Sequence, residues 1–536
     1  MKTLKKFLSM VALALVGAMM TGCSNDDDSI IDTPQQTENK SNVVTLTTTV
    51  SMDGGASTRA LTADGVKTFA AGETMAVIYN NGTSTVKAVS HTLEAGDLID
   101  GGRSATFTFD LETPDKDVAV TYIYPAAMAN SDGSINYDAL NSQDGTLATL
   151  ASNLDLATYS GAWNAGTLPT GTLTNQLSIL AVTLKNEAGS SDITSSITDL
   201  TLNDGTNTYN VTREAVAGPI YVAIRPTTSA TITVTTTVGT KNYKKTLIGK
   251  TYAKGNGYPV SWTMAKVVAY SSEINVPAGE HWYIGGSGTD NITIGNDATV
   301  TIGGYLRMQD ASIICSGNAT IILADGTDAN IFNGRIKAGP AGTTLTIKGN
   351  TGELEITAAN SYGAAIGASD GDACGNIVIE GGIITAMGVQ GAGIGASTAK
   401  CGDITISGGT VTATGSNGAG IGASNAECGD ITISGGSVTA ICGDAGAGIG
   451  SGASSNAWCG NITISGGTVT ATGGFMSAGI GTGAENSCGD ITIKSTVTSV
   501  TATKGSYAEA SIGAAIDGDS YCGTVTIEDK SKVTQN

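Results

Sequence analysis

After residue 42, hydrophobic and polar residues alternate with a period of two along many short runs of the chain. The clearest runs lie at residues 44–50, 76–79, 105–109, 118–122 and 231–235. Alternation of this kind predicts β-strands that bury one face. A helical period appears only for a turn or two around residues 147–156. Residues 43–267 are therefore expected to form two β-sandwich domains, at 43–160 and 161–267.

The second half of the chain is repetitive. The dipeptide Cys-Gly recurs at residues 374, 401, 428, 459, 488 and 522, spaced by 27, 27, 31, 29 and 34, with a further copy at 442 out of step. One unit reads CGDITISGGTVTAT from Cys401 and continues to GAGIG at 418–422. Three short extended segments per unit, separated by Gly, predict the triangular turns of a parallel β-helix. We expect initial turns over 268–373 and Cys-Gly turns over 374–536.

The same alternation predicts the interior of this solenoid. The inward positions of the Cys401 unit are Ile404, Ile406, Val411, Ala413 and Ile421. The inward positions of the next unit, stacked on them about 4.8 Å away, are Ile431, Ile433, Val438, Ala440 and Ile449. Ile433 should therefore lie between Ile406 and Ile464, and the Gly pairs such as 408–409 should form corners.

Composition limits the chemistry. The formal charge of −20, from 27 Lys and Arg against 47 Asp and Glu, disfavours nucleic acid and anionic lipid surfaces as partners. The two His residues offer little material for a catalytic triad or a zinc site. We therefore expect no metal, no other cofactor and no enzymatic activity, and a polysaccharide-degrading enzyme is the weakest of the functional hypotheses.

The N-terminus resembles a bacterial lipoprotein signal. Lys2, Lys5 and Lys6 precede an apolar stretch at 7–20, and a small-residue site ends at Cys23. The resemblance implies a signal peptide at 1–22 and a diacylated Cys23, which would supply the two chains that stable membrane anchoring requires. Residues 23–42 are expected to be a disordered tether. Its acidic start at 24–28 is similar to the export tag of surface lipoproteins, which implies the outer face of an outer membrane.

Six short segments follow one another along the first half of the chain: Ser57–Ala60, Phe69–Val77, Tyr122–Pro125, Leu177–Val182, Tyr221–Pro226 and Gly257–Trp262. In sequence and in their order along the chain, residues 1–265 resemble the fimbrillin and Mfa-like lipoproteins. The resemblance implies two tandem transthyretin-like β-sandwiches, followed here by the β-helix in an all-β chain. It also implies that a trypsin-like protease cuts between Arg59 and Ala60 and removes a strand at about 43–51. A strand of another fimbrial subunit would then fill the groove. A permanent first strand beside an uncut loop is the alternative.

Shaft fimbrillins end near the position of Trp262, but this chain continues with a different composition. The resemblance therefore favours a tip subunit or a stand-alone adhesin at the cell surface, with the β-helix displayed for adhesion to a glycan or protein. Carbohydrate binding by a lipoprotein is the second hypothesis. Its possible ligand face is a row of outward hydroxyl residues: Thr410, Thr412, Thr414, Thr439, Thr468, Thr470 and Thr472. The alternative is that Thr simply suits a solvent-facing strand.

Three other sets of repeated or aromatic residues are open to interpretation. The six in-step Cys are expected to form a ladder of buried reduced thiols, although adjacent turns come close enough for disulfides. Asp403, Asp430, Asp490, Asn376 and Asn461 form a second column, interpreted as turn caps with a Ca²⁺ site as the alternative. The aromatic residues expected in loops are Tyr362, Trp458, Phe475, Tyr507 and Tyr521.

Overall fold

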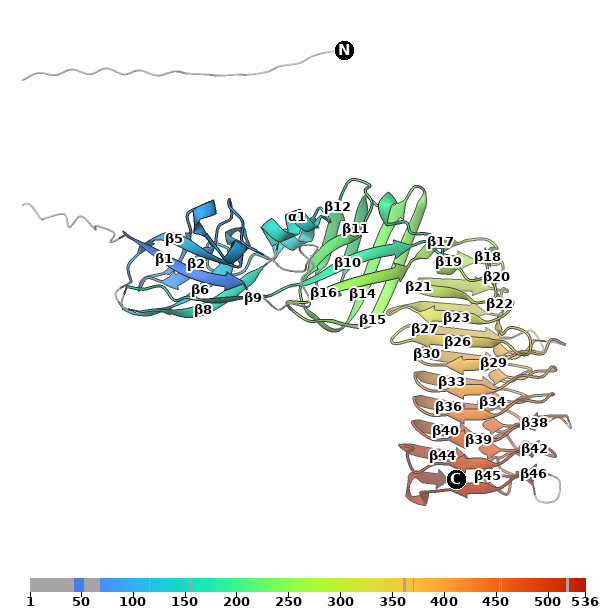
Figure 1. Ribbon diagram of the computed structural model, residues 1–536. Helices are drawn as coiled ribbons and strands as arrows, with labels where there is room; N and C mark the ends of the chain where they lie inside the picture. Colours follow the sequence, from blue (N-terminus) through green and yellow to red (C-terminus); the bar gives the residue numbers. More distant parts are fainter. Residues whose placement is uncertain are drawn as a thin grey trace, which may run out of the picture.

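The computed structural model describes residues 43–52, 68–114, 116–154, 156–164, 166–359, 363–369, 371–452, 454, 456–516 and 520–536. Figure 1 shows two β-sandwiches side by side, followed by a column of stacked strands that turns away from their common line. The regular secondary structure of the described residues is almost entirely β-strand, in the expected all-β architecture, with turns and loops between the strands. The short helical segments are α1 (Leu147–Thr149), η1 (Ala95–Asp97), η2 (Asp100–Gly102), η3 (Ala126–Met128), η4 (Asp138–Asn141), η5 (Leu150–Leu154), η6 (Thr194–Ser196) and η7 (Lys530–Lys532).

The first sandwich folds one eight-stranded sheet over an aromatic core. Its strands are β1 (Val43–Met52), β2 (Ala76–Asn80), β3 (Thr85–Val89), β4 (Leu98–Ile99), β5 (Ser104–Glu112), β6 (Val118–Tyr124), β8 (Ala157–Trp163) and β9 (Gly171–Asn175). They are ordered β3-β2-β6-β8-β9-β1-β5-β4. Phe69 packs edge-on against Phe107 and Tyr124, with ring centroids 5.4 and 5.2 Å away. Such pairs add to the stabilisation from apolar burial.

The second sandwich packs a three-stranded sheet, β13-β10-β16, against strands β11, β12, β14 and β15. Its strands are β7 (Ser142–Gln143), β10 (Ser178–Lys185), β11 (Asp199–Asn203), β12 (Thr208–Thr212), β13 (Ile220–Ile224), β14 (Thr227–Val238), β15 (Lys241–Tyr252) and β16 (Gly257–Thr263). The first sandwich extends past residue 160, since β9 belongs to its sheet and pairs with both β1 and β8. Conversely, Met128, Leu140 and Leu150 are buried in the core of the second sandwich. The chain thus crosses between the two cores more than once.

The second sandwich is continuous with the solenoid. Strand β17 (Ala265–Tyr270) pairs antiparallel with β15 and parallel with β19 (His281–Gly288). The other initial strands are β18 (Ile274–Val276), β20 (Ile292–Ile294), β21 (Ala298–Gln309), β22 (Ile313–Cys315), β23 (Ala319–Leu323), β24 (Asp328–Phe332) and β25 (Ile336–Lys337). One sheet therefore runs from the sandwich into the column through the two residue pairs that join β15 to β17.

Each later turn of the solenoid has three strands, except the last described turn, which has two, and the strands stack in parallel with their counterparts in adjacent turns. The first strands are β26 (Thr344–Gly349), β29 (Asn376–Ile379), β32 (Ile404–Ile406), β35 (Ile431–Ile433), β39 (Ile462–Ile464), β43 (Ile491–Ile493) and β47 (Val525–Ile527). The second strands are β27 (Glu353–Ala358), β30 (Ile383–Gly388), β33 (Thr410–Gly415), β36 (Ser437–Cys442), β40 (Thr468–Thr472), β44 (Ser499–Thr503) and β48 (Val533–Gln535). The third strands are β28 (Ile366–Gly367), β31 (Ile394–Gly395), β34 (Ile421–Gly422), β37 (Ile449–Gly450), β41 (Ile480–Gly481) and β45 (Ile512–Gly513).

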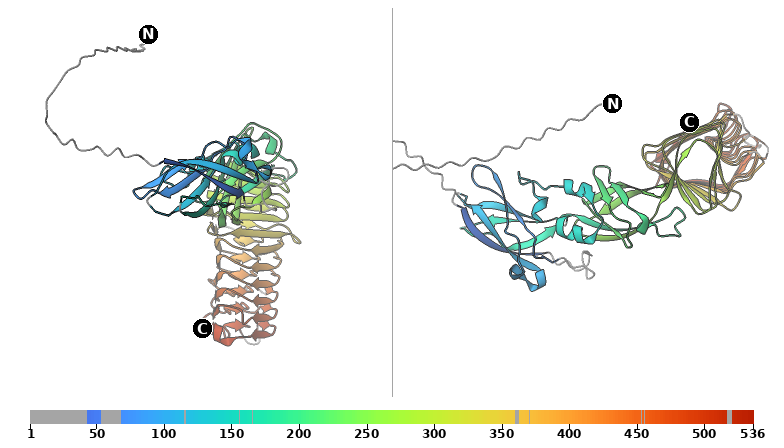
Figure 2. Two further views of the ribbon diagram at one scale, coloured as in Figure 1. Left: turned by 60° about the vertical axis from the view of Figure 1, so that its left-hand side comes forward. Right: turned by 90° about the horizontal axis from the view of Figure 1, so that it is seen from above.

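A fourth, minor column lies at the Cys-Gly corner. It consists of β38 (Trp458–Cys459), β42 (Ser487–Cys488) and β46 (Tyr521–Cys522). Seen from above in Figure 2, the turns of the solenoid lie over one another around a common outline.

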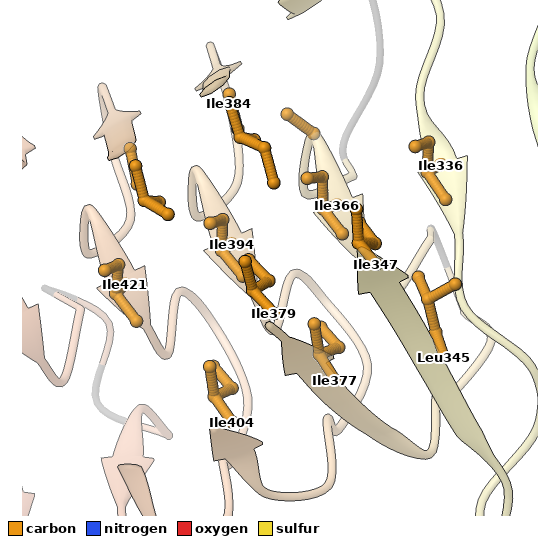
Figure 3. Close-up of a cluster of buried hydrophobic side chains, with 14 of the residues drawn as sticks. Ile336, Leu345, Ile347, Ile366, Ile377, Ile379, Ile384, Ile394, Ile404 and Ile421 are labelled. Carbon is orange, nitrogen blue, oxygen red and sulfur yellow. The ribbon is translucent and has the colours of Figure 1, made fainter. Parts of the chain in front are cut away.

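The predicted interior of the solenoid is confirmed. Ile433 pairs in register with Ile406 on one side and Ile464 on the other. All ten inward residues named for the two units from Cys401 and Cys428 are at most 1 % exposed. Figure 3 shows the same stacking in the preceding turns, where Ile347, Ile379 and other isoleucines point into one core.

Glycine is required in the third strand of each turn. The Gly residues of β28, β31, β34, β37, β41 and β45 have φ between 118 and 136°, a region that L side chains rarely adopt. A Cβ on Gly422 would lie 2.1 Å from the carbonyl oxygen of Gly450. In each Ile-Gly dipeptide, the Ile side chain therefore fills the core, and the Gly lets the backbone of the next turn approach closely.

The substitution Ile433→Asp should destabilise the turns around it by about 3 kcal/mol or more, because it buries an unpaired carboxylate. Its matched control is Thr432→Asp, where the half-buried side chain faces outward and the expected cost is about 0.5–1 kcal/mol. Hydrogen exchange of peptides from residues 404–464 in the full chain would measure both. Equal protection in the two variants would contradict the inward assignment.

Candidate functional site

The outward side of the second strands carries a regular array of hydroxyl groups, which we call the threonine face. Its central column runs in register through six turns: Thr385, Thr412, Thr439, Thr470, Thr501 and Thr534. A second column joins Thr410, Ser437, Thr468 and Ser499. In the third column Ile441 separates Thr414 from Thr472. The structure thus brings together all seven threonines proposed as a ligand face.

The hydroxyls of these seven threonines are available to a ligand. Thr410 and Thr468 are exposed, and the other five are half-buried between their neighbours. Within the described part of the chain, none of the seven side chains has a hydrogen-bond partner. Because the turns hold the array by backbone pairing, little side-chain order has to be gained when a flat ligand binds.

Two aromatic rings adjoin the end of the threonine face. Phe475 follows β40 by three residues, and Tyr507 follows β44 by four. Their ring centroids are 4.4 Å apart, and the Tyr507 amide donates to the Phe475 carbonyl over 3.0 Å. The rings stay 53 % and 67 % exposed, so together they form a projecting apolar surface. The sequence signal for this pair was an aromatic residue at nearly the same place in two adjacent turns.

Two of the other aromatic residues, Trp458 and Tyr521, lie at the Cys-Gly corner. Phe475 and Tyr507 occupy turns, as expected, but the expectation of loops is wrong for Trp458 and Tyr521. Those two lie in β38 and β46, where backbone pairing at the Cys-Gly corner extends them into short strands. Tyr362 lies outside the described residues.

The Asx column acts as a continuous set of turn caps. The Oδ1 atom of Asn376 accepts from the Asp403 amide over 2.9 Å, and Oδ1 of Asp403 accepts from the Asp430 amide over 2.9 Å. The pattern continues through Asn461 and Asp490 at 2.7 and 2.9 Å. Each side chain therefore satisfies a backbone donor of the following turn, as the capping interpretation predicted. Among the described residues, no cluster of three or more His, Cys, Asp or Glu side chains is arranged to hold a metal ion.

The six in-step cysteines stack as a ladder of free thiols. Five of them are buried and Cys522 is half-buried. The sulfur atoms of Cys374 and Cys401 are 3.0 Å apart, and those of Cys488 and Cys522 are 3.1 Å apart. Burial raises the pKa of Cys459. By contrast, the hydrogen bond from the Cys488 thiol lowers the pKa of Cys522.

The residues predicted for lipidation and processing, Cys23, Arg59 and Ala60, lie outside the described residues. Within the described part of the chain, none of the helices combines the length and apolar character needed to cross a membrane. The strand predicted for removal is β1. It pairs with β5 over nine residues and with β9 over three, so it lies inside the sheet of the first sandwich.

The comparisons with known proteins agree with this division of the chain. A family model described as "Beta helix repeat" matches residues 377–398, 404–425, 431–453 and 462–484. These four segments are similar to the repeats of that family. Each match begins at or one residue after the start of a first strand and extends past the third strand of the same turn. The beta helix repeats therefore coincide with single turns of the solenoid. No curated protein matches the chain.

The N-terminal part is similar to several solved structures. A fimbrial assembly protein from Parabacteroides distasonis has 11 % identity and a TM-score of 0.25, and the match covers 41 % of this chain and 90 % of that one. A "putative cell adhesion protein" from Bacteroides uniformis has 14 % identity and a TM-score of 0.24, covering 41 % and 93 %. Another with this description, from Bacteroides ovatus, has 10 % identity and a TM-score of 0.26, covering 42 % and 95 %.

Cys522 should be the thiol of the ladder that alkylates first. Its lowered pKa increases the thiolate fraction near neutral pH, and its sulfur is the least buried of the six. Brief treatment of the folded protein with iodoacetamide, followed by peptide mapping, should label Cys522 well before Cys459. Faster labelling of Cys459, or equal labelling of Cys459 and Cys522, would contradict the prediction that Cys522 is the more reactive thiol.

Proposed function

We propose that this protein is a cell-surface adhesin that binds its ligand on the threonine face. The observation that carries the proposal is the array of unpartnered hydroxyls held in register beside the Phe475–Tyr507 pair. The two sandwiches support this role, because they lie between β1, where the described chain begins, and the solenoid (Figure 1). The resemblance of residues 1–265 to the fimbrillin and Mfa-like lipoproteins supports it as well.

A carbohydrate is the class of ligand that the aromatic pair favours. Sugar rings present C–H groups on one side and hydroxyls around the edge, so an exposed aromatic surface next to a row of hydroxyls suits both. Neutral polar contacts also suit a protein with a formal charge of −20. A protein ligand bound on the same face is the alternative, and binding measurements distinguish the two.

Substitutions on the threonine face and in the neighbouring aromatic pair test the adhesin proposal. Thr470→Val removes one hydroxyl from the threonine face, and Phe475→Ala removes half of the aromatic surface. Loss of a single hydrogen bond of about 1 kcal/mol should weaken binding roughly fivefold, and loss of the ring should weaken it about tenfold. Binding of the full chain to a glycan array and to host-cell monolayers would measure both effects.

The matched control is Thr463→Val. Thr463 is equally half-buried and lies in the same turn, but it points outward from the first strand, between Thr432 and Thr492. This control should bind as well as the unmodified protein. A threonine-face variant that binds like Thr463→Val would exclude this face. Cell binding without any glycan binding, if lost in Thr470→Val, would identify a protein ligand.

We further propose that Cys23 is diacylated, anchors the protein on the outer face of the outer membrane, and that cleavage after Arg59 gates assembly with fimbrial subunits. Strand β1 supports the second part, because its inner residues Val50 and Met52 pack in one core with Phe107 and Phe109 of the neighbouring strand β5. Its removal would leave the facing edges of β5 and β9 unpaired, which an incoming strand of another subunit can satisfy.

Mass spectrometry of the protein released from intact cells would test both parts of this proposal. We expect a diacyl mass on the peptide that begins at Cys23, and a second population that begins at Ala60 after treatment with a trypsin-like protease. Arg59→Ala should remove the Ala60 terminus and any polymer ladder on unboiled gels, whereas Arg103→Ala, at an exposed site of the same sandwich, should keep both. An unmodified Cys23, or a ladder that persists in Arg59→Ala, would contradict the corresponding part.

A further inference from the structure

A separate cavity lies where the second sandwich meets the first turns of the solenoid. Strand β15 runs beside the outward side of β19, β21, β23 and β26, and the enclosed space has a volume of about 180 Å³. This is smaller than the ~300–1,000 Å³ typical of pockets for drug-sized ligands, so it suits a single small molecule. Its polar lining includes Lys244, Lys245, His281, Thr299, Thr301 and Lys348.

The cavity gathers positive charge in an acidic protein. Three lysines and one histidine line it, and the described lining contains no Asp or Glu. Two of the lysines have partners, since Lys244 Nζ donates to the Tyr283 hydroxyl over 2.9 Å and Lys348 pairs with Glu380 at 2.9 Å. Lys245 has no carboxylate within ion-pair distance among the described residues.

The environment of Lys245 disfavours its charge. The side chain is half-buried, and burial together with the nearby Lys250 lowers the pKa of its ammonium group. Burial also lowers the pKa of His281, and the proximity of Lys245 lowers it further. A charged group removed from water without a partner is costly, so an anion that entered the cavity would relieve an existing imbalance.

Neutral hydrogen-bonding groups lie beside these cations. Thr299 and Thr301 project from β21 on its half-buried outward side, and no hydrogen bond to another described residue engages their hydroxyls. The ring of Tyr283 is fixed by Lys244, whose Nζ lies 4.1 Å from the ring centroid. The cavity therefore offers one unpaired cation, two hydroxyls and the side of an aromatic ring to the same occupant.

We propose that this cavity binds a sugar residue that carries a carboxylate, such as a uronic acid. The carboxylate would pair with Lys245, and the ring hydroxyls would hydrogen-bond to Thr299 and Thr301. This site is independent of the threonine face, because it is built from the initial turns and from β15. Its failure would leave the adhesin proposal untouched.

Isothermal titration calorimetry of the full chain with sodium glucuronate tests the proposal, with glucose and sodium acetate as comparison ligands. Glucuronate should bind at least tenfold more tightly than either, because glucose lacks the charge and acetate lacks the ring hydroxyls. Absence of glucuronate binding, or equal affinity for acetate, would overturn the assignment to an acidic sugar.

Three variants locate the binding. Lys245→Met keeps most of the side-chain volume and should reduce the affinity for glucuronate at least tenfold. Thr301→Val keeps the charge and should reduce it severalfold, which gives a second test should Lys245→Met disturb the junction. Lys254→Met removes an exposed positive charge just beyond β15 and should bind normally. Unchanged affinity in both cavity variants, or an equal loss in Lys254→Met, would overturn the site.

Discussion

Backbone hydrogen bonding between successive turns is the interaction on which the rest of this molecule depends. Each turn of a parallel solenoid offers a row of unpaired N–H and C=O groups to its neighbour, and only another turn in register satisfies them all. At the N-terminal end of the column the second sandwich meets part of this requirement, because β15 pairs with β17 at two residue pairs and β17 pairs with β19. The junction is therefore part of the sheet, and the sandwich fixes the direction of the column (Figure 1).

Strict register converts repetition in the sequence into columns in space. One residue type at one place in each unit becomes the core when it is Ile, a capping column when it is Asp or Asn, and a thiol ladder when it is Cys. The threonine face arises in the same way, from outward positions whose side chains do not pack in the core. A surface built like this changes little from turn to turn, so it suits an extended ligand better than a compact one.

The sequence predicted most of the fold, because alternation and repeat length are local signals. The inward isoleucines, the Asx caps and the stacking of the seven threonines follow from the position of each residue within its unit. The passage of residues 126–154 into the second core was not predictable, because it depends on contacts between distant segments. The same holds for the Lys245 cavity, whose lining comes from unrepeated segments on both sides of the junction. Trp458 and Tyr521 were assigned to loops because two-residue strands leave no periodic signal.

The unequal spacing of the Cys-Gly dipeptides has a further consequence. Units of 27 to 34 residues pair without a change of register in any of their three main strands, so the additional residues are confined to the corners. A whole unit can then be duplicated or lost in a gene without disturbing the turns on either side. Each such event would lengthen or shorten the column by about 4.8 Å. The length of the column can thus change in fixed steps, independently of the two sandwiches that carry it.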